Sequence, residues 1–473
     1  MAGLLMAALA VSPGMANEVD AVPEHEQDMQ RPEELKGTLP DGTAWLIKVP
    51  QNWNGTLLRD LDFATNAEFE MTLPRYEDLL NRGYAFAGLA RHPLRPWRYD
   101  PQYEIKNLER VQDIFAEQVA VPNHVLQYGC SGAGLVSLSS AEAFPDKIDG
   151  AVVLSAHTPV WMMNSFLDGW FAMKSLLADD FESRGLGKAS DLLVANLPNP
   201  AVEGMPPAPE IIPPWQSLIE AAGETAEGRA RLALAFAVGQ WSPWMAEGTE
   251  LADPSDANAM GELIVQSALR NSINVGGTAR LMFENAAMGQ QMSGNETADY
   301  AALYENAAPN MKGIVEKLYA EAGLDIASDL QKINSQPRIA ASDYALEFWS
   351  KPGRTNNGDP KVPVMRVHSL GDWAIPYTVL QGYQDLVEEK GNSDLYRQVL
   401  LERTGHCVFT VAESTTAVET LMARIETGSW PDTSPEALTR FASERVEGAD
   451  TRFIDFDDWR VGAYNHTWVP AAE

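Results

Sequence analysis

The two cysteines of this chain place the strongest constraint on its fold, because each is next to a residue that can take part in acyl transfer. Cys130 directly precedes Ser131, in Tyr-Gly-Cys-Ser-Gly-Ala-Gly, and Cys407 directly follows His406, in Thr-Gly-His-Cys-Val. A disulfide holds its two Cα atoms within about 7 Å of each other. If these cysteines pair, the loop of the serine must lie beside the loop of the histidine. The alternative is two buried free thiols.

Short apolar runs alternate with helical patterns in both terminal thirds of the chain. The runs that predict strands are residues 43–49, 55–61, 84–89, 124–128, 151–155, 362–369 and 395–401. The composition or the spacing of apolar residues predicts helices at residues 76–82, 107–120, 132–144, 377–389 and 414–426. Strands separated by helices pair in parallel, so the expected class is α/β, a mostly parallel sheet covered by helices.

The alternation stops in the middle of the chain, which at 473 residues is long enough for a large core or two domains. Residues 159–350 are rich in Ala, Met, Leu and Glu and predict a large helical cap, or lid, inserted into the sheet domain. The sheet domain then consists of residues 40–158 and 351–430. We expect a loose lead-in at residues 17–40, and no structure is assigned to the acidic, aromatic tail at 431–473.

The first 16 residues form a short apolar run that ends in small residues. This pattern is typical of a secretory signal peptide, although no Lys or Arg precedes the run. A buried N-terminal helix is the alternative, and Pro13 and Gly14 disfavour it. Export would place both cysteines where disulfides persist. The expected location is therefore secreted or periplasmic.

An excess of acidic residues disfavours nucleic acids and anionic membranes as partners. The chain has 66 Asp and Glu against 35 Lys and Arg, a net charge of −31. Such a surface repels the phosphates of nucleic acids and disfavours adsorption to anionic membranes. After the N-terminal run, no apolar stretch reaches the roughly 18 residues of a membrane span. We therefore expect neither a nucleic-acid partner nor a membrane span.

Ser131 lies between a predicted strand and a predicted helix, in Gly-x-Ser-x-Ala-Gly. A serine at the tip of a tight strand-to-helix turn adopts strained backbone angles, and small neighbours such as Gly129 and Ala133 let the flanking segments approach closely. The N-terminus of the following helix directs free amides at a developing oxyanion. This context favours a nucleophile over an ordinary turn serine.

A nucleophilic serine needs a base, and the base needs a carboxylate to orient it. In α/β-hydrolases these residues follow in the order Ser, Asp, His. Asp372 follows the predicted strand 362–369, and His406 follows the strand 395–401. A turn-capping aspartate and a surface histidine are the alternatives. His368 lies within a strand, so we expect it to be packed.

The remaining site residues are less strongly indicated. One oxyanion donor is expected at the Gly132 amide, and the second at Asp62 or Phe63, in the loop after the strand 55–61. Trp373, beside the predicted acid, and Trp161, at the start of the lid, are candidates for the wall of an apolar substrate pocket. We expect no metal and no cofactor.

At these positions the chain resembles the tannase and feruloyl esterase family. The matching residues are Cys130-Ser131, Asp372 and His406-Cys407. The resemblance implies a disulfide between the two cysteines and a large lid between the serine and the acid. It also implies a carboxylic-ester hydrolase, a serine esterase, often for esters of aromatic acids. The expected partner is then a small-molecule ester.

Two other functions stay open. An exported serine aminopeptidase would use the same triad and would need carboxylates in the lid, such as Glu203 or Glu210, to bind a substrate ammonium. Arg91 and Arg98 are candidates for binding a substrate carboxylate, although a surface role is preferred. A non-catalytic binding protein on a hydrolase fold would usually lack a triad member, whereas this chain retains three candidates. The oligomeric state is not indicated.

Overall fold

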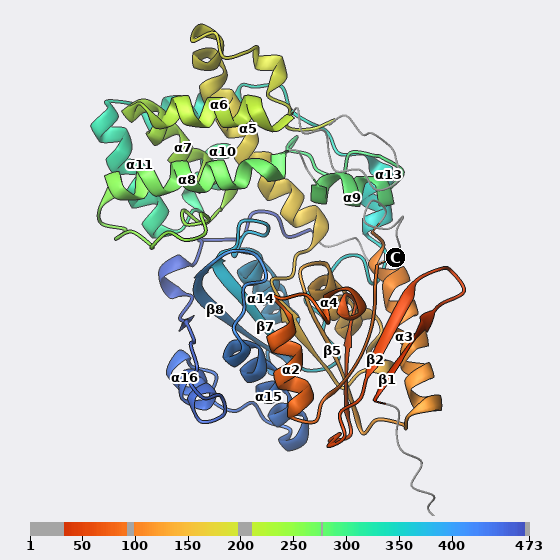
Figure 1. Ribbon diagram of the computed structural model, residues 1–473. Helices are drawn as coiled ribbons and strands as arrows, with labels where there is room; N and C mark the ends of the chain where they lie inside the picture. The colour runs from red at the N-terminus through yellow and green to blue at the C-terminus, as the bar shows by residue number, and fades with distance from the viewer. Residues whose placement is uncertain (1–32, 92–98, 197–210, 276–277, 469–473) are drawn as a thin grey trace, which may run out of the picture.

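The computed structural model describes residues 33–91, 99–196, 211–275 and 278–468, and its centre is a twisted sheet (Figure 1). Nine strands of the described residues form this sheet in the order β1-β2-β4-β3-β5-β6-β7-β8-β9. The strands from β4 to β8 are parallel, whereas β2 and β9 run antiparallel to their neighbours. The strands are β1 (Glu34–Thr38), β2 (Ala44–Lys48), β3 (Thr56–Asp60), β4 (Ala85–Leu89), β5 (His124–Cys130), β6 (Gly150–Leu154), β7 (Val364–Gly371), β8 (Tyr396–Thr404) and β9 (Phe453–Ile454).

Helices cover both faces of the sheet, which explains why its central strands are uninterrupted apolar runs. Successive residues of a strand point to opposite faces. Leu57 therefore joins the core beneath α3 and α4, while Leu58 joins the core beneath α2 and α15. The helices around the sheet are α1 (Phe63–Asn66), α2 (Leu73–Asn81), α3 (Pro101–Gln118), α4 (Gly132–Ala143), α14 (Val379–Glu389), α15 (Val411–Thr427) and α16 (Pro435–Ser443). This arrangement is the α/β-hydrolase fold, so the predicted fold class is confirmed.

A second group of helices connects β6 to β7 and lies beyond one end of the sheet (Figure 1). Helix α7 packs against α5, α8 and α11, and its Ala-rich sequence is buried along nearly its whole length. The helices of this group are α5 (Pro159–Ser183), α6 (Ile212–Gly223), α7 (Ala226–Gly239), α8 (Ala257–Val275), α9 (Thr278–Ala286), α10 (Tyr300–Glu305), α11 (Pro309–Ala322), α12 (Ile326–Asn334) and α13 (Asp343–Trp349). That the group acts as a separate lid stays a prediction.

The structure differs from the sequence-based expectation at three places. The lead-in contains β1, and the tail contains α16 and β9, where no structure was assigned. Helix α3 begins at Pro101 rather than at residue 107, since Asp100 caps it by accepting a hydrogen bond from the Gln102 amide at 3.2 Å. The proposed signal peptide, residues 1–16, lies outside the described residues. None of the helices in the described ranges combines the length and apolar composition needed to cross a membrane.

Candidate active site

Ser131 occupies the junction between β5, which ends at Cys130, and α4, which begins at Gly132. Its backbone has φ 59° and ψ −119°, a conformation that non-glycine residues rarely adopt. The Ser131 amide donates to the carbonyl of Leu154 at 3.1 Å and so anchors the turn on the neighbouring strand. Strain of this kind concentrates at functional sites, where the surrounding structure maintains it.

The close approach of β5 and α4 explains the small residues around this serine. A Cβ atom added to Gly129 would lie 2.5 Å from the Cβ of Ala133, a distance that packed atoms do not reach. Glycine at 129 therefore leaves the space that the Ala133 methyl group occupies. Ala133, where the motif more usually has glycine, is therefore accommodated because residue 129 has no side chain.

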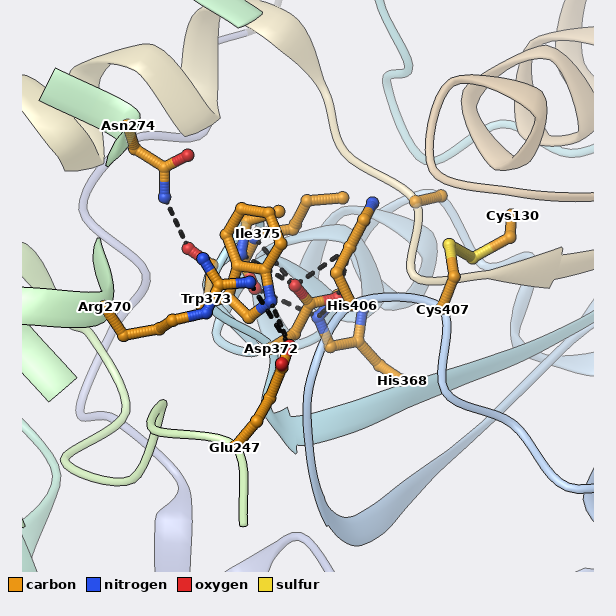
Figure 2. Close-up of polar contacts among 12 residues, drawn as sticks. Cys130, Glu247, Arg270, Asn274, His368, Asp372, Trp373, Ile375, His406 and Cys407 are labelled. Atoms are coloured by element: carbon orange, nitrogen blue, oxygen red, sulfur yellow. Dashed lines mark hydrogen bonds and ion pairs between the residues drawn. A yellow bond between two sulfur atoms is a disulfide. The ribbon is translucent and has the colours of Figure 1, made fainter. Parts of the chain in front are cut away.

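The two cysteines form the expected disulfide. Cys130 and Cys407 are bonded with their Cα atoms 6.0 Å apart (Figure 2). Cys407 has φ 61°, so both segments that meet at the disulfide have a residue in the left-handed region. The bond joins the end of β5 to the loop after β8, and it therefore brings the segment of Ser131 next to the segment of His406.

His406 and Asp372 form a directly hydrogen-bonded pair (Figure 2). The Nδ1 atom of His406 lies 3.0 Å from each carboxylate oxygen of Asp372. The carboxylate also accepts hydrogen bonds from the amides of Ala374 and Ile375, at 2.9 and 3.1 Å. Burial alone would raise the pKa of Asp372, but the charge of His406 and its hydrogen bond outweigh burial and lower it. An ionised Asp372 holds the proton on Nδ1 and leaves the other ring nitrogen of His406 available as a base.

Ser131 and His406 line one cavity of about 240 Å³, and the disulfide forms part of its wall. The other walls come from the end of β3 and from the segment that includes α1 and α2. Polar side chains on these walls include Asp60, Asp62, Arg75 and Tyr76. The predicted nucleophile and base therefore share a space that is large enough for a small organic molecule.

The backbone amides near Ser131 separate the two candidates for the second oxyanion donor. The amide of Asp62 donates to the carboxylate of Asp60 at 3.0 Å, so it is already engaged. Phe63 and Gly132 are the first residues of α1 and α4, where helix geometry provides no acceptor for the amide. This arrangement favours the Phe63 amide over the Asp62 amide as the second oxyanion donor, beside the Gly132 amide.

Arg91 is part of the site and not a free surface residue. Its Nε and Nη2 atoms donate to the two carboxylate oxygens of Asp62, at 2.7 and 2.8 Å. The guanidinium lies directly against the turn, because a Cβ atom on Gly132 would be 2.7 Å from Nη2. The Arg91–Asp62 pair thus stabilises the wall next to the Gly132 amide. Arg98, Glu203 and Glu210 lie outside the described residues.

Asp60 is a buried acid with an unusual protonation equilibrium. Its carboxylate accepts a hydrogen bond from the hydroxyl of Tyr76 at 2.6 Å. Burial, and then the negative charge of Asp62, raise the pKa of Asp60 to about 7. Near neutral pH, this carboxyl group is therefore partly protonated.

Two further histidines lie close to the pair but are held neutral. Burial lowers the pKa of His157 to about 3, assisted by the positive charges of His406 and Arg91. Burial also lowers the pKa of His368 to about 4, although Asp372 opposes the shift. His368 is fully buried and its Nε2 lies 3.2 Å from the Ile375 carbonyl, as expected for a packed histidine.

Trp373 lies against the catalytic candidates, with its ring centroid 5.8 Å from that of His406. Residues of the helical group hold it in place (Figure 2). The guanidinium of Arg270 lies 3.8 Å from the ring centroid, and the indole nitrogen donates to Glu247 at 2.8 Å. Asn274 donates to the Trp373 carbonyl at 2.7 Å. The helical group therefore contacts the loop of Asp372 directly.

Trp161 does not belong with these residues. It is fully buried in α5, and its indole nitrogen donates to the carbonyl of Trp468 at 3.1 Å. It is not among the residues that line the cavity of Ser131. Trp373 is also absent from that lining, so the expectation that Trp161 and Trp373 form the wall of a substrate pocket stays a prediction.

Sequence reasoning missed several polar residues that gather here. Asp60 is the last residue of β3, at the edge of the sheet where the carboxyl ends of parallel strands carry functional residues. Its position could therefore have identified it as a candidate. Nothing local distinguishes Arg75 or Glu247 from ordinary helix and loop residues. Within the described ranges, no group of three or more His, Cys, Asp or Glu residues is placed to hold a metal ion.

Comparison with known proteins decides the family. No family model matches the chain. Over 456 residues the chain is 49% identical to the o-phthalyl amidase of Xanthobacter agilis, and the alignment covers 95% of this chain and 99% of that relative. This chain belongs to the family of that amidase. It is therefore a hydrolase that acts on carboxylic acid derivatives.

Solved structures show weaker likeness to this member of the amidase family. Feruloyl esterase B from Aspergillus oryzae is 14% identical, with a TM-score of 0.37 and coverage of 84% of this chain and 81% of that one. Another esterase from Aspergillus oryzae is 12% identical, with a TM-score of 0.36 and coverage of 84% and 80%. The resemblance to the tannase and feruloyl esterase family rests on Cys130-Ser131, Asp372 and His406-Cys407 alone.

Proposed function

We propose that the protein is a serine hydrolase that releases o-phthalyl groups, benzoyl groups with a carboxylate at the ortho position, from amides through an acyl-enzyme on Ser131. The observation that carries this proposal is the 49% identity, over 95% of the chain, to an o-phthalyl amidase. The sequence-based expectation of an ester hydrolase of aromatic acids agrees with it on the acyl group. The two differ on the leaving group.

In the first half of the reaction, Ser131 Oγ attacks the amide carbonyl and its proton passes to Nε2 of His406. The carbonyl oxygen becomes an oxyanion, and the amides of Gly132 and Phe63 donate to it. Asp372 stabilises the imidazolium through the Nδ1 bond. His406 then gives its proton to the leaving nitrogen, the C–N bond breaks, and the amine departs.

In the second half, water enters and attacks the acyl-enzyme. His406 takes a proton from the water, and the C–O bond to Ser131 breaks as His406 returns that proton to Oγ. The acid leaves and the enzyme is regenerated. Since this half is identical for amides and esters of one acid, we propose that matched esters are also substrates.

We also infer that the protein acts outside the reducing cytosol. The disulfide between Cys130 and Cys407 supports this, because such bonds persist in oxidising compartments. The apolar run at residues 1–16 has the pattern of an export signal.

The test compares an o-phthalyl arylamide, the matched aryl ester and an aminoacyl arylamide as substrates of wild type and Ser131→Ala. We expect hydrolysis of the first two by wild type and a loss of at least about 1,000-fold in Ser131→Ala. Turnover of the aminoacyl arylamide alone would favour the aminopeptidase. No turnover, together with no labelling of Ser131 by a fluorophosphonate, would favour a binding protein.

A further inference from the structure

Arg75, the third residue of α2, is a buried arginine with unused hydrogen-bond donors. Its exposed fraction is 6%, yet its Nε and Nη1 atoms have no hydrogen-bond partner among the described residues. Its guanidinium carbon lies 6.0 Å from the centroid of the Phe409 ring. Leaving buried charged donors unsatisfied costs free energy, so an acceptor supplied by a bound molecule would stabilise Arg75.

The position of Arg75 shows where that acceptor would be. Arg75 lines the cavity of about 240 Å³ that Ser131 and His406 also line. A molecule in this cavity can therefore contact the guanidinium and the reacting serine together. A cavity of about 150 Å³ already holds benzene, so the space accepts an aromatic acid.

The two acidic residues that line the cavity do not neutralise the charge of Arg75. The carboxylate of Asp62 is bound on both oxygens by Arg91. The carboxyl group of Asp60 accepts hydrogen bonds from the Tyr76 hydroxyl and from the Asp62 amide. Asp60 interacts with Arg75 through space, although burial raises the pKa of this acid to about 7. Arg75 is thus a cation of the cavity whose Nε and Nη1 donors have no hydrogen-bond partner in the part of the chain that the structure describes.

We propose that Arg75 binds the second carboxylate of the acyl group while Ser131 attacks the scissile carbonyl. A guanidinium presents parallel N–H donors that match the two oxygens of a carboxylate. This assignment rests on the proposed function and makes Arg75 the residue that selects acids with two carboxyl groups. A substrate without the second carboxylate leaves the guanidinium buried and unpaired, which disfavours its binding and its transition state.

The experiment measures kcat/KM for two amides of the same arylamine, one with an o-phthalyl group and one with a plain benzoyl group. We expect wild type to prefer the o-phthalyl amide. In Arg75→Met, which keeps an unbranched apolar stem without the guanidinium, the ratio of the two kcat/KM values should fall by roughly 10- to 100-fold. Arg75→Lys, which keeps the charge without the fork, should give an intermediate ratio.

A matched control removes another buried arginine. Arg424 on α15 is 8% exposed and donates to Asp394 at 2.7 Å, away from the cavity. Arg424→Met should leave the substrate ratio at the wild-type value. If it lowered the ratio as much as Arg75→Met does, a general loss of packing would explain both results and the assignment would be wrong.

A binding measurement keeps the proposal testable if Arg75→Met does not fold. Calorimetry on Ser131→Ala should show tighter binding of phthalate than of benzoate, and Arg75→Lys in that background should reduce the difference. Equal binding of the two acids overturns the carboxylate subsite. Failure of wild type to cleave either amide overturns the proposed function, whereas an o-phthalyl preference that persists in Arg75→Met overturns the role of Arg75 alone.

Discussion

At the scale of single residues, the triad candidates were predictable and the residues around them were not. Ser131, Asp372 and His406 each follow a recognisable strand, so local patterns placed them at one edge of the sheet. Asp60 and Arg75 reach the same cavity from β3 and α2. Their environment depends on how α2 packs beneath the turn of Ser131, and no local pattern encodes that packing.

Asp60 yields a prediction about stability and pH. Its pKa is about 7 in the folded protein, against an ordinary value of 3.8. The folded state therefore binds the proton more tightly than the unfolded state, and stability falls as pH rises from 4 towards 7. Relative to Asp60→Asn, the free energy of unfolding of wild type should fall by about 2–3 kcal/mol between pH 5 and pH 8. Denaturant unfolding of both proteins measures the difference, and a difference that does not change with pH would contradict the prediction.

At the scale of elements, the sheet was predictable because its central strands are buried on both faces. β6 is fully buried, so it reads as a continuous apolar run. β1 alternates between exposed and half-buried residues at the edge of the sheet and contains two charged residues and a glycine, so its sequence has no apolar run. β9 has only two residues, and its pairing with β8 defines it.

The disulfide yields a prediction at this scale, since it joins the β5–α4 turn to the loop after β8. Both segments also retain independent anchors. The Ser131 amide bonds to Leu154, and α15 begins with a capping box formed by Thr410 and Glu413. Reduction should therefore loosen the relative positions of Ser131 and His406 more than it loosens the fold. A displacement of about 1 Å can reduce turnover roughly 100-fold.

The measurement follows activity and circular dichroism after mild reduction, with thiol release verified by titration. Activity should fall roughly 100-fold while the far-ultraviolet spectrum is retained. The double variant Cys130→Ala/Cys407→Ala should behave like the reduced protein and should not respond to the reductant. Full activity in that variant would show that the disulfide has no part in positioning the site.

At the scale of the whole molecule, the helical group and the sheet meet at the candidate active site. The sequence indicated that residues 159–350 form helices, but it gave no sign of how they would contact the sheet. Three of their residues, Glu247, Arg270 and Asn274, hold Trp373. Trp373 follows Asp372 in the chain and packs against His406. Trp373 therefore couples the helical group to the base.

This coupling predicts that a change in the helical group alters catalysis without touching the triad. Arg270→Ala removes the cation over the Trp373 ring, together with the ion pair to Glu247 at 3.3 Å. Such a contact is worth about 1 kcal/mol, so kcat should fall about fivefold as Trp373 and His406 lose their fixed orientation. KM should change less, because Arg270 does not line the cavity of Ser131.

A control in the same helical group separates this effect from a general loss of stability. Lys312 also lies over an aromatic ring, 5.5 Å from the centroid of Tyr304, and its ion pair is with Glu305 and not with a residue that contacts Trp373. Lys312→Ala should retain wild-type kcat. Equal values of kcat in Arg270→Ala and Lys312→Ala, with both proteins folded, would mean that the helices and the base are not coupled through Trp373. A fall of kcat in Arg270→Ala alone would instead show that the helical group helps to position His406.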